Sequence, residues 1–174
     1  HAFRNVRSGK YIHLPGNSDG PEHRVVQWDC IEMGSKFEIL QVGDDALESV
    51  PSTASGTIIL LKSASSGLFL SSHGDENGLV TQSESPDNTS RFTVEGEEGQ
   101  YRFKNVASGL WLHVAAGCGT KGEAVKLVDN EDEGISWEVV TDEQDLTTHP
   151  GGDPLRASCF MHDAADVASA CNGP

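Results

Sequence analysis

Long hydrophobic runs and positive charge are both scarce in this chain. No stretch approaches the roughly 18 consecutive apolar residues that a membrane-spanning helix needs, so we expect no membrane insertion. Lysine and arginine together number 12 against 27 aspartates and glutamates, which gives a formal net charge of −15. Such a surface repels phosphate backbones, and nucleic acid is therefore not an expected partner.

Spacings typical of metal sites are also missing. The seven histidines show neither H-x-x-x-H nor H-E-x-x-H spacing, and the four cysteines form no C-x-x-C pair. We therefore predict no catalytic residues, no metal site and no cofactor, and we expect a binding protein rather than an enzyme.

The four cysteines, at positions 30, 118, 159 and 171, give information on the redox environment in which the protein functions. Their even number, the sequon Asn88-Thr89-Ser90 and a start at His1, which fits a processed chain, favour a secreted or extracellular protein. Three pairings are possible. Closeness in sequence favours Cys159 with Cys171, which leaves Cys30 and Cys118 either bridged or both free. A continuous helix from 159 to 171 would separate its ends by about 18 Å. A disulfide needs Cα atoms about 4.4–6.8 Å apart, so the tail is not both one helix and bridged within itself.

Three segments share one pattern, and this repeat is the main signal for the fold. Residues 3–13 (FRNVRSGKYIH) and 103–113 (FKNVASGLWLH) are identical at six of eleven positions, and residues 61–71 (LKSASSGLFLS) are a looser copy. Each copy then runs through a polar loop to a short apolar stretch. It closes on an aromatic residue in an alternating strand, at Phe37, Phe92 and Trp137.

Each copy is predicted to hold four short strands around a Ser-Gly turn. One such unit cannot bury its apolar face, but three can close around a shared axis. We therefore predict an all-β protein, a β-trefoil over residues 1–142 with repeats at about 1–42, 57–96 and 100–142. The closing aromatics are expected in its core, and Tyr11/Ile12 and their counterparts are expected either in the core or half-buried at the barrel floor. Residues 43–56 are expected to be a polar connector. Residues 143–174 are expected to be a C-terminal extension packed on the trefoil, with 163–170 as a short helix.

These repeats resemble those of the ricin-B-like lectins. The resemblance rests on Ser8-Gly9-x-Tyr11-Ile12, Val25-Val26-Gln27-Trp28-Asp29-Cys30 and Phe37-x-Ile39-Leu40, and it covers roughly residues 1–142. It implies a β-trefoil with shallow pockets for galactose-type sugars. Such a pocket has an aspartate after the first apolar pair, an aromatic platform on the third strand and an amide near the closing aromatic.

The chain departs from this pocket in every copy. His13, Ser71 and His113 occupy the aspartate position, and Ser35, Ser90 and Ile135 occupy the amide position. The platform maps to Trp28 in the first copy, to Gln82 or nearby in the second and to Leu127 in the third. The first copy is the best candidate, because a sugar needs an aromatic face and convergent polar groups. The predicted carbohydrate-binding residues are His13, Asn17, Asp19, His23, Trp28, Asp29 and His113, with Trp28 as the stacking platform unless it is a core residue. The two histidines could equally be structural.

Two functions follow, with different partners. The first is a lectin that binds glycans or glycoproteins of the galactose/GalNAc type through a shallow pocket on the first repeat. The second is a β-trefoil protease inhibitor that presents a loop, with residues 43–56 and the loop of Lys121 as candidates. A structural or storage trefoil without a ligand is the third reading. The sequence does not specify the oligomeric state.

Overall fold

The structure, a computed structural model, describes residues 1–15, 20–21, 23–43, 47–49, 54–72, 78–114, 120–129 and 133–141. The predicted C-terminal extension with its helix and its two cysteines, and also Cys118, lie outside these residues. No helix in the described part is long and apolar enough to cross a membrane.

Each repeat contains four short strands, as predicted. The first repeat comprises β1 (Ala2–Asn5), β2 (Tyr11–His13), β3 (Val26–Trp28), the 3-10 helix η2 (Met33–Ser35) and β4 (Phe37–Val42). The second comprises β6 (Ile58–Ser63), β7 (Phe69–Ser72), β8 (Val80–Ser83) and β9 (Arg91–Glu95). The third comprises β10 (Arg102–Asn105), β11 (Trp111–Val114), β12 (Val125–Val128), the 3-10 helix η3 (Glu133–Ile135) and β13 (Trp137–Val140).

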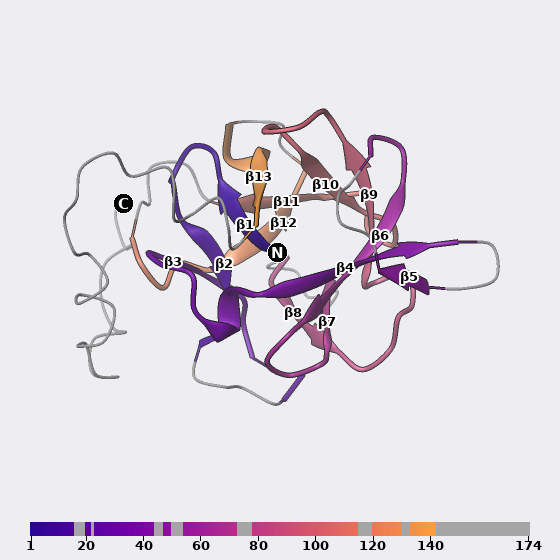
Figure 1. Cartoon of the computed structure of the whole chain (residues 1–174), viewed down its shortest axis with the longest axis horizontal. Coiled ribbons are helices and arrows are strands. Elements are labelled where there is room, and N and C mark those ends of the chain that lie inside the picture. Colours follow the sequence, from indigo (N-terminus) through magenta and orange to yellow (C-terminus); the bar gives the residue numbers. More distant parts are fainter. Residues whose placement is uncertain are drawn as a thin grey trace.

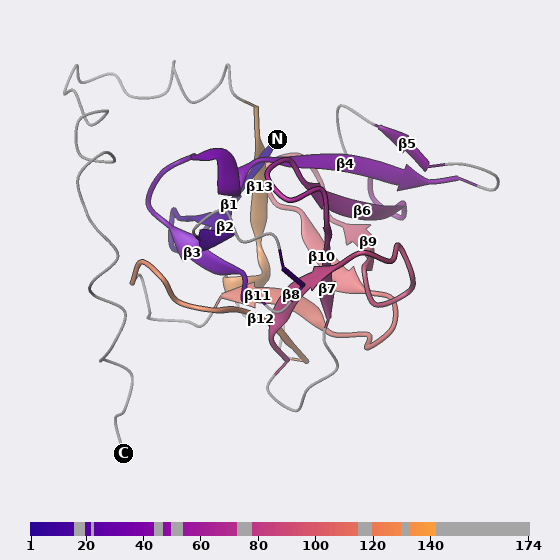
Figure 2. The same cartoon turned by 90° about the horizontal axis from the view of Figure 1, so that it is seen from below.

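One strand falls within the segment predicted as a polar connector. β5 (Leu47–Ser49) pairs antiparallel with the end of β4, with Leu40 opposite Ser49. The β4–β5 hairpin projects from the body of the molecule in both views (Figures 1 and 2). Among the described residues this strand has no counterpart in the other repeats, so it is an addition to the threefold pattern there.

The strands form a closed barrel with three hairpins. The first strand of each repeat pairs antiparallel with the last strand of the preceding one: β6 with β4, β10 with β9, and β1 with β13. Within the repeats the ring closes through β6–β9 pairing, the Tyr101–Trp137 bridge and a bond from Phe37 N–H to His1 O (2.8 Å). The middle strands form the hairpins β2–β3, β7–β8 and β11–β12. A six-stranded ring with three hairpins is the architecture of a β-trefoil.

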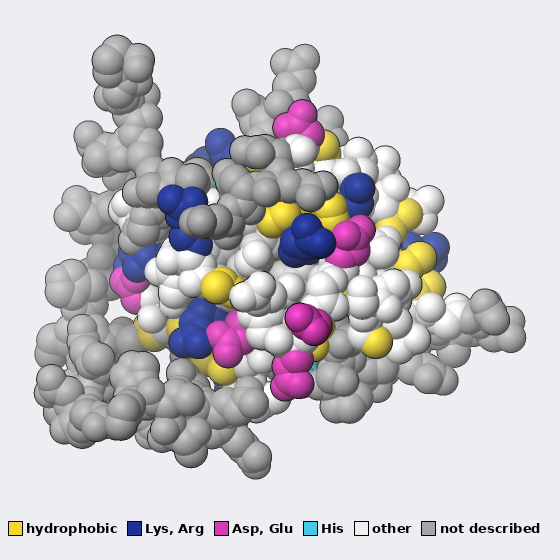
Figure 3. Space-filling view, turned by 90° about the horizontal axis from the view of Figure 1, so that it is seen from above, with side chains coloured by type: hydrophobic (Ala, Val, Ile, Leu, Met, Phe, Trp, Pro, Cys, Tyr) yellow, Lys and Arg dark blue, Asp and Glu magenta, His cyan; other side chains and the backbone are white. Residues whose placement is uncertain are grey.

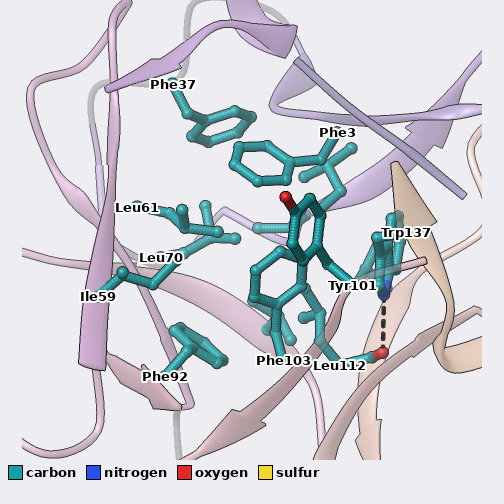
Figure 4. Packing of buried hydrophobic residues seen from close by; sticks show 14 of the residues in the cluster. Phe3, Phe37, Ile59, Leu61, Leu70, Phe92, Tyr101, Phe103, Leu112 and Trp137 are labelled. Atoms are coloured by element: carbon teal, nitrogen blue, oxygen red, sulfur yellow. Dashed lines mark hydrogen bonds between the residues drawn. The ribbon is translucent and has the colours of Figure 1, made fainter. Parts of the chain in front are cut away.

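Aromatic side chains fill the barrel, as the repeat pattern predicted. Phe37, Phe92 and Trp137 are 2%, 0% and 0% exposed. The Phe3 ring lies edge-on to the rings of Phe37 and Phe103, with centroids 6.0 and 5.6 Å away (Figure 4). The Trp137 Nε1–H donates to the backbone oxygen of Leu112 (3.0 Å), so its one polar group is satisfied inside the core.

A buried asparagine ties each of two repeats to its neighbour. The Asn5 side-chain N–H donates to the Gly134 carbonyl of the third repeat (2.8 Å), and its Oδ1 accepts the Ser8 backbone N–H (3.0 Å). Asn105 repeats this arrangement with the Ser108 N–H (3.0 Å) and a carbonyl oxygen of the second repeat (2.7 Å). The amide that recurs at an offset of 100 therefore shapes the Ser-Gly turn and fastens it to the adjacent repeat.

Two glycines just before the closing strands allow a close backbone approach. A Cβ on Gly34 would overlap the backbone oxygen of Leu14 and lie 2.8 Å from the His13 ring. A Cβ on Gly134 would meet the corresponding atoms of the third repeat, with the His113 ring at 2.6 Å. A larger residue at either position would have to push a barrel hairpin away from its closing strand.

We predict that Gly34→Ala and Gly134→Ala each lower the free energy of unfolding by about 1–3 kcal/mol, because the new methyl group overpacks a rigid backbone contact. Gly20→Ala is the matched control, since its Cβ would touch only the His23 side chain, at 3.5 Å. Denaturant unfolding of the three variants checks this. Equal stability of Gly134→Ala and Gly20→Ala would contradict the close approach.

Candidate functional site

The candidate site centres on Trp28, at the end of β3. Tyr11 pairs with Trp28 and His13 pairs with Val26 in the β2–β3 hairpin, so His13 and Trp28 are diagonal neighbours on one face of the hairpin. Their rings stack with centroids 4.8 Å apart and planes inclined by 15°. His13 is buried, at 3% exposure, whereas Trp28 is half-buried. Trp28 is therefore neither a core residue nor a freely exposed one.

Hydrogen bonds fix both rings. The Trp28 Nε1–H donates to Glu32 Oε1 (3.2 Å). His13 Nδ1 lies 2.9 Å from Ser35 Oγ, and this hydroxyl donates to the Cys30 carbonyl (3.3 Å). A serine hydroxyl has one proton, so the bond to Cys30 leaves it to accept from His13, and the arrangement assigns the imidazole proton to Nδ1. The stack is thus oriented before any ligand arrives.

A third group, from another repeat, covers Trp28. The Lys121 Nζ lies 3.8 Å from the centroid of the Trp28 ring, a cation–π contact. His13 lies on β2, along one edge of β3, whereas the segment of Lys121 pairs with the other edge of β3 through Gln27. Lys121 and His13 therefore lie on opposite faces of Trp28.

Backbone pairing holds the loop of Lys121 against β3. The Gly122 N–H donates to Gln27 O and the Gln27 N–H donates to Glu123 O, both at 2.8 Å, and Val26 pairs with Ala124. The segment before β12, drawn in orange, runs beside β3 in both ribbon views (Figures 1 and 2). The site is therefore shared between the first repeat and a loop of the third.

Burial keeps His13 uncharged. Desolvation lowers its pKa from the ordinary value near 6.5 to about 4, with Glu32 raising the pKa and Lys121 lowering it. At neutral pH the imidazole of His13 is uncharged, stacks on Trp28 and hydrogen-bonds Ser35. The positive charge beside Trp28 then belongs to Lys121.

The other predicted site residues are dispersed. Asp29 is exposed and forms an ion pair with Lys10 beside the hairpin. His23 is exposed, and its backbone N–H bonds to Gly20 O (3.5 Å). His113 is buried on β11, in a different repeat, opposite Lys126. Asn17 and Asp19 lie outside the described residues. Only His13 and Trp28 of the predicted set are in direct ring contact, and their carbohydrate-binding role stays a prediction.

Strand pairing corrects the platform positions in the other repeats. Trp28 lies opposite Tyr11, and the corresponding pairs are Phe69 with Ser83 and Trp111 with Val128. The platform equivalents are thus Ser83, which falls within the predicted 'Gln82 or nearby', and Val128, one residue beyond the predicted Leu127. Gln27 and Gln82, each one residue before the platform position, are buried and bond the serine of the Ser-Gly turn. Ser8 Oγ donates to the buried Gln27 Oε1 (2.6 Å), and Ser66 makes the same bond to Gln82.

Sequence reasoning missed two groups that touch the stack. Lys121 was assigned to an inhibitor loop and Glu32 was not considered, whereas Ser35 had been mapped to the amide position of the pocket. Lys121 is about ninety residues away in the chain, so only the packing of one repeat on another brings it here. Half of the other candidate inhibitor loop (43–56), residues 44–46 and 50–53, lies outside the described residues, and inhibition stays a prediction.

Two glycine patterns typical of catalytic sites also occur, in equivalent loops. Residues 16–20 read G-x-S-x-G and residues 117–122 read G-x-G-x-x-G. The first pattern needs a strand-to-helix turn, and the second needs a strand followed by a helix whose N-terminus holds phosphate. Here they connect the antiparallel strands β2 to β3 and β11 to β12. In each case the next described element is a strand and not a helix. In the described part of the chain, no three His, Cys, Asp or Glu side chains gather as a metal site would require.

We predict that the free energy of unfolding falls by about 3 kcal/mol through His13 as the pH drops from 6.5 to 4. The unfolded chain binds this proton near pH 6.5 and the folded protein only near pH 4, so acid favours unfolding across that window. Chemical unfolding at several pH values, for the wild type and for His13→Gln, isolates this contribution from the carboxylates. Parallel pH curves for the two proteins would contradict a buried neutral imidazole.

Comparison with known proteins supports the fold alone. No protein-family model and no curated protein matches the chain. Among solved structures it is similar to a designed threefold-symmetric protein, ThreeFoil, with a TM-score of 0.67, 18% identity, and coverage of 80% of this chain and 96% of that one. It is also similar to parts of two enzymes, covering 80% of this chain in each case. One is an endo-β-galactosidase from Clostridium perfringens, with a TM-score of 0.59, 18% identity and coverage of 31% of that chain. The other is an exo-β-1,3-galactanase from Clostridium thermocellum, with a TM-score of 0.65, 18% identity and coverage of 29% of that chain. At these identities the likeness concerns architecture, and it agrees with the strand pairing that the chain is a β-trefoil.

Proposed function

We propose that this protein binds glycans or glycoproteins of the galactose/GalNAc type through the surface around Trp28, as a lectin and without catalysis. The observation that carries the proposal is a half-exposed, pre-oriented indole beside polar groups, on the strand where a trefoil lectin would place its platform. Galactan- and galactoside-cleaving enzymes that contain a trefoil of this shape give additional support.

Polar groups around the indole suit a sugar. Lys10 and Asp29 form an exposed ion pair near the end of the hairpin, and Glu32 lies at the indole N–H. A pyranose has one apolar face and several hydroxyls, so it would stack on the indole while these groups accept and donate hydrogen bonds. His13 supports the opposite face of the indole and is too buried to be a main contact.

Lys121 must move for stacking to occur. It lies over the indole face that His13 leaves open, so a sugar ring can reach that face only if the lysine side chain swings away. An exposed cation–π contact is worth about 0.5–1 kcal/mol, which is a modest cost compared with burying a sugar face on tryptophan. The covered indole is therefore compatible with weak, shallow binding of a neutral sugar.

We predict that galactose or GalNAc changes the intrinsic fluorescence of the wild type, because Trp28 is half-buried while Trp111 and Trp137 are 4% and 0% exposed. Trp28→Ala should weaken binding about tenfold by removing the stacking face. Trp28→Phe, which keeps an aromatic ring, should lose less. A fluorescence titration and a glycan array measure both effects. A folded wild-type protein that binds no glycan would rule out the lectin.

A further inference from the structure

Within the described residues Lys121 has no anionic partner, whereas three other cations do. Arg4 bonds Glu138, Lys10 bonds Asp29 and Arg102 lies 3.6 Å from Glu95. Several basic side chains on the face shown in Figure 3 likewise adjoin acidic ones. Lys121 is exposed, and within the described residues its ammonium group has no ion pair and rests only on the Trp28 ring.

Two carboxylates beside this stack are already engaged. Glu32 accepts the Trp28 N–H at 3.2 Å, and Asp29 holds Lys10. The Lys121 backbone is fixed by the bonds of Gly122 and Glu123 to Gln27, so only its side chain needs to turn. An ammonium group that leaves the indole therefore remains close to it and lacks a counter-charge.

Building on the glycan site proposed above, we propose that this site selects sugars with an anionic substituent, carboxylate or sulfate, and that Lys121 is the residue that recognises it. The sugar ring takes the indole face that Lys121 vacates, and the ammonium group pairs with the substituent. A neutral sugar also displaces the lysine side chain but has no anionic group with which the displaced ammonium can pair. The anionic sugar replaces a cation–π contact with a charge-assisted hydrogen bond, which is the stronger of the two.

The acidity of the whole protein does not oppose this. The net charge of −15 repels anions at long range, but at physiological ionic strength charges beyond about 8 Å are largely screened. Among the described cations beside the indole, Lys121 is then the one available to an anion, because His13 is neutral and Lys10 is paired with Asp29, while the Glu32 carboxylate is a negative charge at the indole N–H. Selectivity arises locally even though the average surface is negative.

The other repeats do not repeat this arrangement. In the second repeat, Gly20 and Pro21 of the first-repeat loop take the place beside the third strand, bonding Gln82, and the platform position is Ser83. In the third repeat the platform position is Val128. The described residues thus combine an aromatic platform with a loop cation only once, so we expect one anionic-sugar site in this part of the chain.

The test compares galactose, galacturonic acid and galactose 6-sulfate, titrated into the full chain at pH 7 and 0.15 M salt with Trp28 fluorescence as the signal. Wild type should bind one or both acidic sugars about three- to tenfold more tightly than galactose. Lys121→Met should abolish that preference and bind galactose about two- to fivefold more tightly, because no cation–π contact is broken. Lys121→Arg should keep the preference. The two acidic sugars show which substituent is recognised.

Lys126→Met is the matched control, because Lys126 is also exposed and lies in the same repeat. This substitution removes the same positive charge as Lys121→Met. It should leave the preference unchanged, and thermal unfolding should show all variants folded. Equal affinities for the three sugars in wild type, or a preference that survives Lys121→Met, would overturn this inference while leaving the lectin proposal intact. Failure of all three sugars to bind would overturn both.

Discussion

Hydrogen bonding between the start of each repeat and the end of its neighbour is the interaction on which the rest of the structure depends. The same backbone bond occurs three times, from Val6 to Ser136, from Ala64 to Lys36 and from Val106 to Arg91, each at 2.9 Å. A lone four-strand unit would leave these groups unpaired and its apolar face in water. Closing the ring satisfies both needs at once, and it brings aromatic rings from all three repeats into one core.

The candidate site lies where the threefold pattern breaks down. Positions that build the barrel keep their character, the closing aromatics in all three repeats and the bonded Ser8–Gln27 and Ser66–Gln82 pairs in two of them. The platform position varies freely, with Trp28 in only one of three places. Residues that support the barrel are constrained by packing, whereas a half-exposed position can change without loss of the fold.

Covering of the indole on both faces gives the site its particular chemistry. His13 holds one face through burial and the bond to Ser35, so that side is part of the scaffold. Lys121 holds the other through an exposed and energetically weak contact, so that side can open. The difference between a fixed and a displaceable neighbour defines which face is available to a ligand and which charge the ligand meets there.

The sequence by itself determined the fold class, the number of repeats, their strand content and the aromatic core, because these follow from local periodicity repeated three times. It also identified Trp28 and His13, which lie on adjacent strands of one hairpin. Tertiary structure alone decided that Lys121 covers Trp28, that β5 extends β4, and that Ser83 and Val128 are the platform equivalents. The physical reason is that strand register and contacts between repeats depend on how segments far apart in the sequence pack together. A local sequence pattern does not specify which of these segments become neighbours.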